Sequence, residues 1–236
     1  MEKKAFITGA DRGLGLSLTK VLLENDYKVF AGRYLKDWPE LDQVKEEYPE
    51  KLKFVPLDLS SDNSVVQAAK LIREETDYLD LLINNAGIYL DDGEDILGEL
   101  NFENMRKMYE VNTLGPLKVT NSLIDLLLKG KEKTLVNISS EAGSIGDCWR
   151  KSEYGYAMSK SAFNMQTAIL HNHLKDYEIK ILAIHPGYLK TYMLGKKNME
   201  ADIEANESAL KIFDLLSGKN DSSGIYMDYL GTQLPW

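Results

Sequence analysis

The sequence predicts one α/β domain, in which helices cover both faces of a parallel sheet of seven strands. Short apolar runs alternate with longer stretches of helical periodicity along the whole chain, which is typical of right-handed strand–helix–strand units. Runs such as 81–83 are apolar without alternation, as expected of strands buried on both faces. The length of 236 residues fits a single domain, and no repeat or linker-like segment divides it.

The strands are expected where the apolar runs are short and bounded by polar or turn residues. In order along the chain they cover 5–7, 28–31, 52–57, 79–83, 134–138, 180–184 and 225–227. Pro56 lies near the end of the third run, where a missing backbone donor disturbs the sheet least.

Four helices are expected between these strands. They cover 14–24, a segment that begins near Asn63, 102–128 and 156–174. The first has an apolar face that can pack on the sheet, and Ser60 or Ser61 can cap the second. Gly115-Pro116 is expected to interrupt the third.

Composition restricts the classes of function. Hydrophobic residues make up 44% of the chain, which is enough for a core and argues against disorder. The net charge is −9 and the basic residues are scattered, so neither nucleic acid nor an anionic membrane is an expected partner. Cys148 is the only cysteine, and no apolar run suits a signal peptide or a membrane span. These features predict a cytoplasmic protein.

The first strand runs directly into a glycine-rich segment, Thr-Gly-Ala-Asp-Arg-Gly-Leu-Gly at 8–15, and then into a helix. Glycines allow a backbone to approach a pyrophosphate, and a helix N-terminus supplies free N–H groups. The spacing differs from the commoner Gly-x-Gly-x-x-Gly pattern, and no Gly-Lys-Ser/Thr follows as in a Walker loop. The segment predicts a dinucleotide site, with a purely structural turn as the alternative.

Two arginines indicate which dinucleotide binds. An acidic residue at the end of the second strand would hold the ribose 2′-hydroxyl of NAD, but Arg33 stands there instead. Arg12 lies within the glycine-rich segment, where it could reach the same position. Two guanidiniums suit a 2′-phosphate, so the sequence predicts NADP(H), although either arginine could be a solvated surface residue.

Tyr156 stands four residues before Lys160 in a predicted helix, so the two side chains lie on one face. A neighbouring ammonium favours the phenolate, which predicts a Tyr156 pKa below its ordinary value of about 10. Such a tyrosine can exchange a proton with an alcohol or a carbonyl oxygen near neutral pH. Tyr154 has Met158 four residues on and lacks this partner. A surface pair is the alternative interpretation.

Several short motifs follow the later predicted strands in a fixed order along the chain. They are Leu57-Asp58-Leu59, Asn84-Asn85-Ala86-Gly87, Val111-Asn112-Thr113, Ser139-Ser140 with Gly143, and Pro186-Gly187 with Leu189 and Thr191. With the glycine loop and the Tyr–Lys pair, they resemble the short-chain dehydrogenase/reductase family, in its single-domain subgroup, over essentially the whole chain. Smaller features, including Leu234-Pro235-Trp236, are similar to the branch of C-factor-like proteins and sniffer-type carbonyl reductases.

The resemblance implies a doubly wound, Rossmann-type sheet and a site for NADP(H). The residues implied in cofactor binding are Gly9, Asp11, Arg12, Gly13, Leu14, Gly15, Arg33, Asp58, Leu59, Asn85, Ala86, Gly87, Tyr156, Lys160, Pro186, Gly187, Leu189 and Thr191. It also implies a homodimer or homotetramer built on the helices at 102–128 and 156–174.

The resemblance further implies reversible hydride transfer, in which NADPH reduces an aldehyde or ketone to an alcohol. Tyr156 would protonate the oxygen, Ser140 would hydrogen-bond to it, and Lys160 would lower the Tyr156 pKa and hold the nicotinamide ribose. Asn112 would fix a water beside Lys160. Ser140 rather than Ser139 has the family's spacing to Gly143. Candidates for the pocket are largely apolar: Ile88, Tyr89, Ile145, Trp149, Tyr188, Tyr192 and Met193.

Two other functions stay open at this point. A non-catalytic NADP-binding regulator could have the same fold. Such a protein would be expected to lack the Ser, Tyr or Lys, and all three are present here. A sugar-nucleotide epimerase or dehydratase would need a larger substrate domain than the about 45 residues after Thr191 provide. His171, His173 and His185 have no partners at metal-ligand spacing, so no metal is expected.

Overall fold

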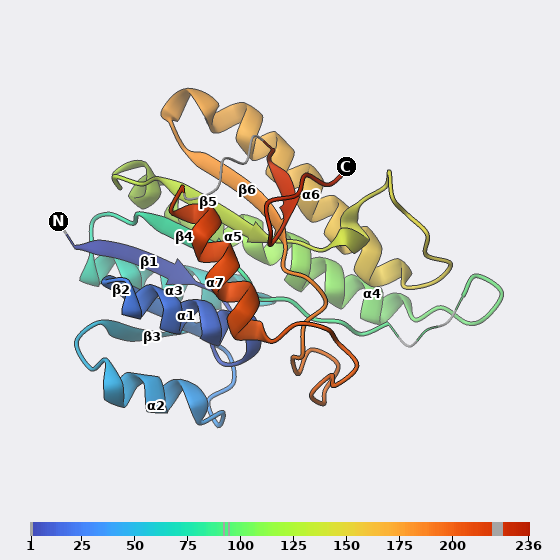
Figure 1. The fold of residues 1–236 in the computed structure, drawn as a ribbon, viewed down its shortest axis with the longest axis horizontal. Coiled ribbons are helices and arrows are strands. Elements are labelled where there is room, and N and C mark those ends of the chain that lie inside the picture. Colours follow the sequence, from blue (N-terminus) through green and yellow to red (C-terminus); the bar gives the residue numbers. More distant parts are fainter. Residues whose placement is uncertain (1, 92, 94, 219–223) are drawn as a thin grey trace.

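Seven parallel strands form one sheet in the order β3-β2-β1-β4-β5-β6-β7 (Figure 1). The computed structural model describes residues 2–91, 93, 95–218 and 224–236. Its strands are β1 Lys3–Ile7, β2 Tyr27–Arg33, β3 Leu52–Pro56, β4 Leu81–Asn84, β5 Thr134–Ile138, β6 Lys180–His185 and β7 Tyr226–Asp228. The predicted seven-stranded, doubly wound parallel sheet is confirmed. The strand order reverses between β1 and β4, and a crevice is expected at the carboxyl ends of the strands there.

Helices cover both faces of the sheet, as predicted (Figure 1). One face carries α1 Gly13–Glu24, α2 Glu40–Glu47 and α7 Ala205–Leu216. The other carries α3 Asp62–Glu75, α5 Gly115–Leu128 and α6 Tyr154–Leu174. Neighbouring residues of β1 point to opposite faces: Ala5 and Ile7 pack with the first group of helices and Phe6 with the second. This arrangement explains why the central strands are apolar throughout.

Two helices were missing from the sequence prediction. The helix α2 buries only Leu41 and Val44 among charged residues, so its periodic signal is short and weak. The helix α7 buries Ala209, Ile212 and Leu215, which recur every three residues and pack against the sheet. Ser61 is the N-cap of α3, and its hydroxyl accepts the Ser64 N–H at 3.3 Å.

The predicted break at Gly115-Pro116 is wrong. A π-helical turn at Glu110–Leu114 joins α4 Phe102–Tyr109 directly to α5. Pro116 lies in the first turn of α5, where a missing N–H is tolerated. A Cβ added to Gly115 would lie 2.7 Å from the Leu59 Cβ, so this glycine permits a close approach rather than ending the helix. Within the described residues, no helix is long and apolar enough to cross a membrane.

Candidate functional site

The glycine loop after β1 is held by residues that follow β4. The Asn85 side-chain amide donates hydrogen bonds to the backbone oxygens of Thr8 (2.9 Å) and Gly9 (3.1 Å). The Thr8 hydroxyl accepts the backbone N–H groups of Asn85 and Ala86, each at 3.0 Å. Gly9 has φ +66°, and a Cβ on it would lie 2.8 Å from the Ala86 Cα. Asn85 and Ala86 therefore shape the loop that the sequence assigned to phosphate.

Asp11 and Leu14, both predicted at the cofactor, are buried in this structure. The Asp11 carboxylate accepts the N–H of Tyr34 at 3.1 Å and that of Leu35 at 3.0 Å, which joins the glycine loop to the end of β2. Burial raises the pKa of Asp11, and these hydrogen bonds oppose the rise. Leu14 packs in the core beside Gly15. The two side chains position the loop, whose surface is formed by backbone.

The two arginines have different surroundings. Both terminal nitrogens of Arg33 pair with the Asp42 carboxylate at 2.7 Å, and its Nε donates to the Leu35 oxygen at 3.3 Å. The Arg12 guanidinium instead lies over the rings of Trp38 (4.9 Å) and Tyr192 (5.9 Å), with no hydrogen bond to a described residue. Most Arg33 donors are thus bound within the chain, whereas those of Arg12 are available, and a direct contact of Arg33 with the cofactor stays a prediction.

The loops after β3 and β6 complete this edge of the sheet. Asp58 accepts the Ser60 N–H at 2.9 Å, and Leu59 is buried against Gly115. Beyond β6, the Pro186 oxygen accepts the Ser208 hydroxyl at 2.7 Å, and Leu189 forms a bridge with Ile203. The structure brings these predicted residues to the same edge as the glycine loop.

The β6 loop also reaches the glycine loop. Gly187 has φ +87°, and a Cβ on it would lie 2.5 Å from the Ile203 side chain. A Cβ on Gly13 would lie 3.3 Å from Thr191 Cγ2. Thr191 therefore closes against the start of α1, on the side where Arg12 meets Tyr192. The glycine loop and the loop after β6 therefore meet at the carboxyl ends of the strands.

Ser140, Tyr156 and Lys160 come together where β5 ends and α6 begins. The Ser140 hydroxyl lies near enough to Tyr156 to lower the pKa of its phenol, and the Lys160 Nζ lies 5.8 Å from the Tyr156 ring centroid. Lys160 is 3% exposed and donates to the Ile138 backbone oxygen at 2.9 Å. This oxygen uses one of the three ammonium donors. No described residue accepts from the other two.

The predicted effect of Lys160 on Tyr156 is absent from this structure. Burial raises the pKa of Tyr156 to about 12, and the hydrogen bond from Ser140 opposes the rise. Burial also lowers the pKa of Lys160 to about 8. Both residues are thus shifted toward their neutral forms, because desolvation is the largest effect on each pKa. The spacing correctly put the residues together but gave the wrong direction for the tyrosine.

Asn112 lies in the π-helical turn, and both N–H groups of its side-chain amide have partners. Its Oδ1 accepts the Ile88 N–H at 2.8 Å, while its Nδ2 donates to the Ile88 oxygen at 2.9 Å and the Ser159 hydroxyl at 3.1 Å. Asn112 therefore ties the loop after β4 to α6. Its predicted role beside Lys160 has no direct contact in support, although a Cβ on Gly87 would meet Asn112 Oδ1 at 3.3 Å and Lys160 Nζ at 3.8 Å.

The choice between the two serines is clear from their neighbours. The Ser139 hydroxyl donates to Asn164 Oδ1 at 2.5 Å inside the fold, so it points away from Tyr156. The Ser140 hydroxyl accepts the Ala142 N–H at 3.1 Å and remains within reach of Tyr156. Tyr154 begins α6 and has no part in this group.

Sequence reasoning missed Asp91, which caps the helix that carries Tyr156. Its carboxylate accepts the N–H of Tyr156 at 2.7 Å and that of Gly155 at 3.3 Å. An acid at a helix N-terminus also interacts favourably with the helix dipole. Asp91 follows β4 and is distant in sequence, so no local pattern connects it with α6.

Sequence reasoning also missed a chain of polar contacts beside Tyr156. The Tyr89 ring lies 5.1 Å from the Tyr156 ring, and its hydroxyl donates to Glu153 at 2.9 Å. Arg150 donates hydrogen bonds to Glu153 at 2.7 Å and to Glu141 at 2.6 Å, and Glu141 is the residue after Ser140. Trp149 and Ile145, predicted in the pocket, are 73% and 76% exposed in the same loop, and Cys148 is a free, exposed thiol.

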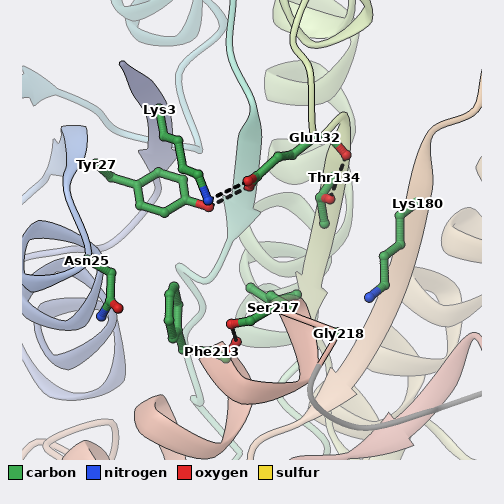
Figure 2. A pocket seen from close by; sticks show the side chains of 10 residues that line it. Lys3, Asn25, Tyr27, Glu132, Thr134, Lys180, Phe213, Ser217 and Gly218 are labelled. Atoms are coloured by element: carbon green, nitrogen blue, oxygen red, sulfur yellow. Dashed lines mark hydrogen bonds and ion pairs between the residues drawn. The ribbon is translucent and has the colours of Figure 1, made fainter. Parts of the chain in front are cut away.

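A pocket of about 520 Å³ lies at the opposite edge of the sheet. Figure 2 shows Lys3, Tyr27, Thr134 and Lys180 around it, and these are the first residues of β1, β2, β5 and β6. Ligands of open α/β sheets bind at the carboxyl ends of the strands, so this pocket does not coincide with the site above. In the described part of the chain, no three His, Cys, Asp or Glu side chains form a metal-binding group.

Comparisons with known proteins agree with this arrangement. The family described as short chain dehydrogenase matches residues 3–202. An uncharacterized oxidoreductase of Schizosaccharomyces pombe is 32% identical, covering 99% of this chain and 98% of the relative. The carbonyl reductase Sniffer of D. melanogaster superposes with a TM-score of 0.90 at 26% identity, covering 100% of both chains. The NADPH-bound carbonyl reductase from chicken fatty liver gives 0.86 at 28% identity, covering 100% of this chain and 94% of the other. The chain belongs to the short-chain dehydrogenase family, and it is an oxidoreductase of that family by sequence and fold.

Proposed function

We propose that this protein reduces an aldehyde or ketone to an alcohol with NADPH. The observation that carries the proposal is the group formed by Ser140, Tyr156 and Lys160, next to the glycine loop. A serine hydroxyl beside a partly buried phenol is suited to bind and protonate a carbonyl oxygen. The similarity to carbonyl reductases, one of them described as NADPH-bound, supports the same reaction.

The residues at the cleft fit NADP(H). The glycine loop and the start of α1 would hold the pyrophosphate, and Arg12, with free guanidinium donors, would bind the 2′-phosphate. Lys160 keeps two unpaired N–H donors although it is buried, and ribose hydroxyls would satisfy them. The remaining predicted contacts at this edge are Asp58, Leu59, Gly87, Pro186, Gly187, Leu189 and Thr191. Arg33 would act indirectly, by fixing the loop after β2.

Each residue has a role that its protonation allows. The cofactor, when bound, would supply the hydride. Tyr156 is a phenol at neutral pH, since its pKa is about 12, so it holds the proton that a reduced carbonyl oxygen requires. Ser140 would donate a hydrogen bond to that oxygen as negative charge develops. The positive charge of Lys160 would stabilise the tyrosinate left behind.

NADPH oxidation across a panel of aldehydes, ketones and quinones tests the proposal. The Tyr156→Phe variant removes only the hydroxyl, so turnover is expected to fall at least about a hundredfold. NADPH is expected to bind it with unchanged affinity in a fluorescence titration. Turnover of the variant at the wild-type rate would contradict the assignment of Tyr156. NADPH binding without turnover of any substrate would favour a non-catalytic regulator instead.

A homodimer or homotetramer and a cytoplasmic location belong to the same proposal. Met158, Met165 and Ile169 are each more than half exposed on one side of α6, and such an apolar row suits a helix packed against a second copy. For the location, the exposed thiol of Cys148 suits a reducing compartment. Light scattering of the purified protein measures the assembly, and a monomer at micromolar concentration would contradict it.

A further inference from the structure

Three carboxylates and one guanidinium surround Tyr156 in the loops after β4 and β5. Asp91 accepts the Tyr156 N–H, and Glu153 accepts the hydroxyl of Tyr89, whose ring contacts Tyr156. Glu141 directly follows Ser140, and Arg150 bridges it to Glu153. Because these loops flank the reacting hydroxyls, a substrate must approach past this group of charges.

The arginine in this group is already paired. Its Nε donates to Glu153 at 2.7 Å, and its two terminal nitrogens donate to the two Glu141 oxygens at 2.7 and 2.6 Å. The Arg150 side chain is only 12% exposed, while Glu141 is 40% and Glu153 32% exposed. The Trp149 ring covers it further, 4.7 Å from its guanidinium carbon. An incoming molecule therefore meets carboxylate oxygens before it meets the guanidinium.

Lys160, the cation beside Tyr156, is turned away from an incoming molecule. Lys160 is 3% exposed and donates to the backbone oxygen of Ile138, so its charge is shielded from solvent. Asp91 makes no ion pair with a described residue, so its charge is met only by backbone N–H groups and the dipole of α6. The substrate side of the site thus carries an excess of negative charge.

We propose that the site selects neutral or cationic carbonyl compounds and rejects those that carry a carboxylate or phosphate group near the carbonyl. The inference rests on the proposed reductase function and adds a substrate class to it. Three carboxylates against one guanidinium leave two net negative charges, and an anion placed about 8 Å from them is repelled enough to lower kcat/KM between about tenfold and about thirtyfold.

A matched set of benzaldehydes tests the charge preference. 4-Formylbenzamide and 4-carboxybenzaldehyde have nearly the same shape and differ in charge, and 4-(trimethylammonio)benzaldehyde supplies the cation. We expect kcat/KM for the amide to exceed that for the carboxylate at least tenfold in low salt. Raising the ionic strength from about 0.02 M to about 0.5 M should narrow the ratio, because salt screens exposed charges. Equal values for amide and carboxylate in low salt would overturn the proposal.

The double substitution Glu141→Gln and Glu153→Gln tests the residues themselves. It removes two charges and frees Arg150, so the amide-to-carboxylate ratio should fall at least tenfold from its wild-type value. The ratio within each protein cancels differences in overall activity and in the reactivity of the aldehydes. Asp125→Asn is the matched control, because it breaks a bidentate pair with Arg73 on the outer faces of α3 and α5, and it should leave the ratio unchanged. An unchanged amide-to-carboxylate ratio in the double variant would overturn the assignment of the charge preference to Glu141 and Glu153. If that variant does not fold, the salt dependence of the wild-type ratio tests the charge preference instead.

Calorimetry separates this inference from the proposed reaction. 4-(Hydroxymethyl)benzamide and 4-(hydroxymethyl)benzoate are titrated into the wild-type protein with NADP⁺ present. Binding of the amide at least tenfold more tightly would support the charge preference even if no aldehyde were reduced, which would contradict only the reductase function. Equal binding, tighter binding of the carboxylate or no binding of either would overturn the charge preference whatever the turnover.

Discussion

The Tyr226 hydroxyl donates a 2.6 Å hydrogen bond to the backbone oxygen of Ser140. The Tyr226 ring stacks on Trp236, with ring centroids 5.2 Å apart, and the Trp236 backbone oxygen accepts the Gly146 N–H at 2.8 Å. The strand β7 and the segment after it therefore fix the backbone on both sides of the 3₁₀ turn that follows Ser140. The position of the Ser140 hydroxyl depends on a residue 86 positions away in the chain.

Tyr226→Phe is expected to lower kcat roughly threefold to tenfold while the KM for NADPH stays the same. The substitution keeps the ring stack but leaves the Ser140 oxygen with the Gly143 N–H (3.0 Å) as its remaining donor, and the lost hydrogen bond costs about 0.5–1.5 kcal/mol. Steady-state kinetics and urea unfolding measure the two effects. Tyr27→Phe is the matched control, because it removes a buried hydroxyl bonded to Glu132 at the opposite edge of the sheet. Equal kcat losses in both variants would show that the effect is a general loss of stability.

Asp91→Ala is expected to reduce both the stability of the fold and kcat. The N–H groups of Gly155 and Tyr156 lose their acceptor, which costs about 1 kcal/mol, and the start of α6 frays where Tyr156 must be held. Ser61→Ala removes the cap of α3 and should cost similar stability without a loss of kcat. Asp91→Asn keeps an acceptor and should restore most of the stability. A wild-type kcat in Asp91→Ala would contradict a positioning role.

The features of the site that could be predicted are those set by residues close together in the sequence or by the order of the strands. The glycine loop and the pair Tyr156 and Lys160 follow from spacing, and the choice of Ser140 over Ser139 follows from the family resemblance. The structure brings these residues to one edge of the sheet. Parallel strands with helices on both faces leave only one edge where all carboxyl ends meet.

The features that the sequence did not predict depend on tertiary contacts. Arg33 looked free because its partner Asp42 lies in α2, a helix with too few apolar residues to be recognised. The direction of the Tyr156 pKa depends on burial, which the spacing to Lys160 does not contain. Asp91 contacts Tyr156 across 65 residues, so no motif could connect them.

Arg12→Ala is expected to weaken NADPH binding much more than NADH binding. Arg12 has free donors, and a charge-assisted contact with a 2′-phosphate contributes roughly 1.5–3 kcal/mol, or about tenfold to a hundredfold in Kd. Arg33→Ala should reduce the stability of the fold instead and change the NADPH-to-NADH ratio less, because its guanidinium is bound to Asp42. Fluorescence titration of each variant with both cofactors measures the ratios. A larger loss of preference in Arg33→Ala would show that Arg33 leaves Asp42 when the cofactor binds.

Lys160→Met is expected to abolish reduction and yet stabilise the fold by about 1–3 kcal/mol at pH 7. Burial lowers the pKa of Lys160 from 10.5 to about 8, so the folded protein holds this charge at a cost near neutral pH, offset in part by the hydrogen bond to Ile138. Between pH 8 and pH 10.5 the unfolded chain binds more protons than the folded one at this residue, so the wild-type contribution from Lys160 improves as the pH rises through that window. The advantage of Lys160→Met should therefore be largest below pH 8 and shrink toward pH 10.5. Urea unfolding at several pH values measures it, with Lys180→Met, a partly buried lysine at the opposite edge, as a control that should keep its activity. A variant that is less stable than the wild type at pH 7, or an advantage that does not change with pH, would contradict the burial of a charged Lys160.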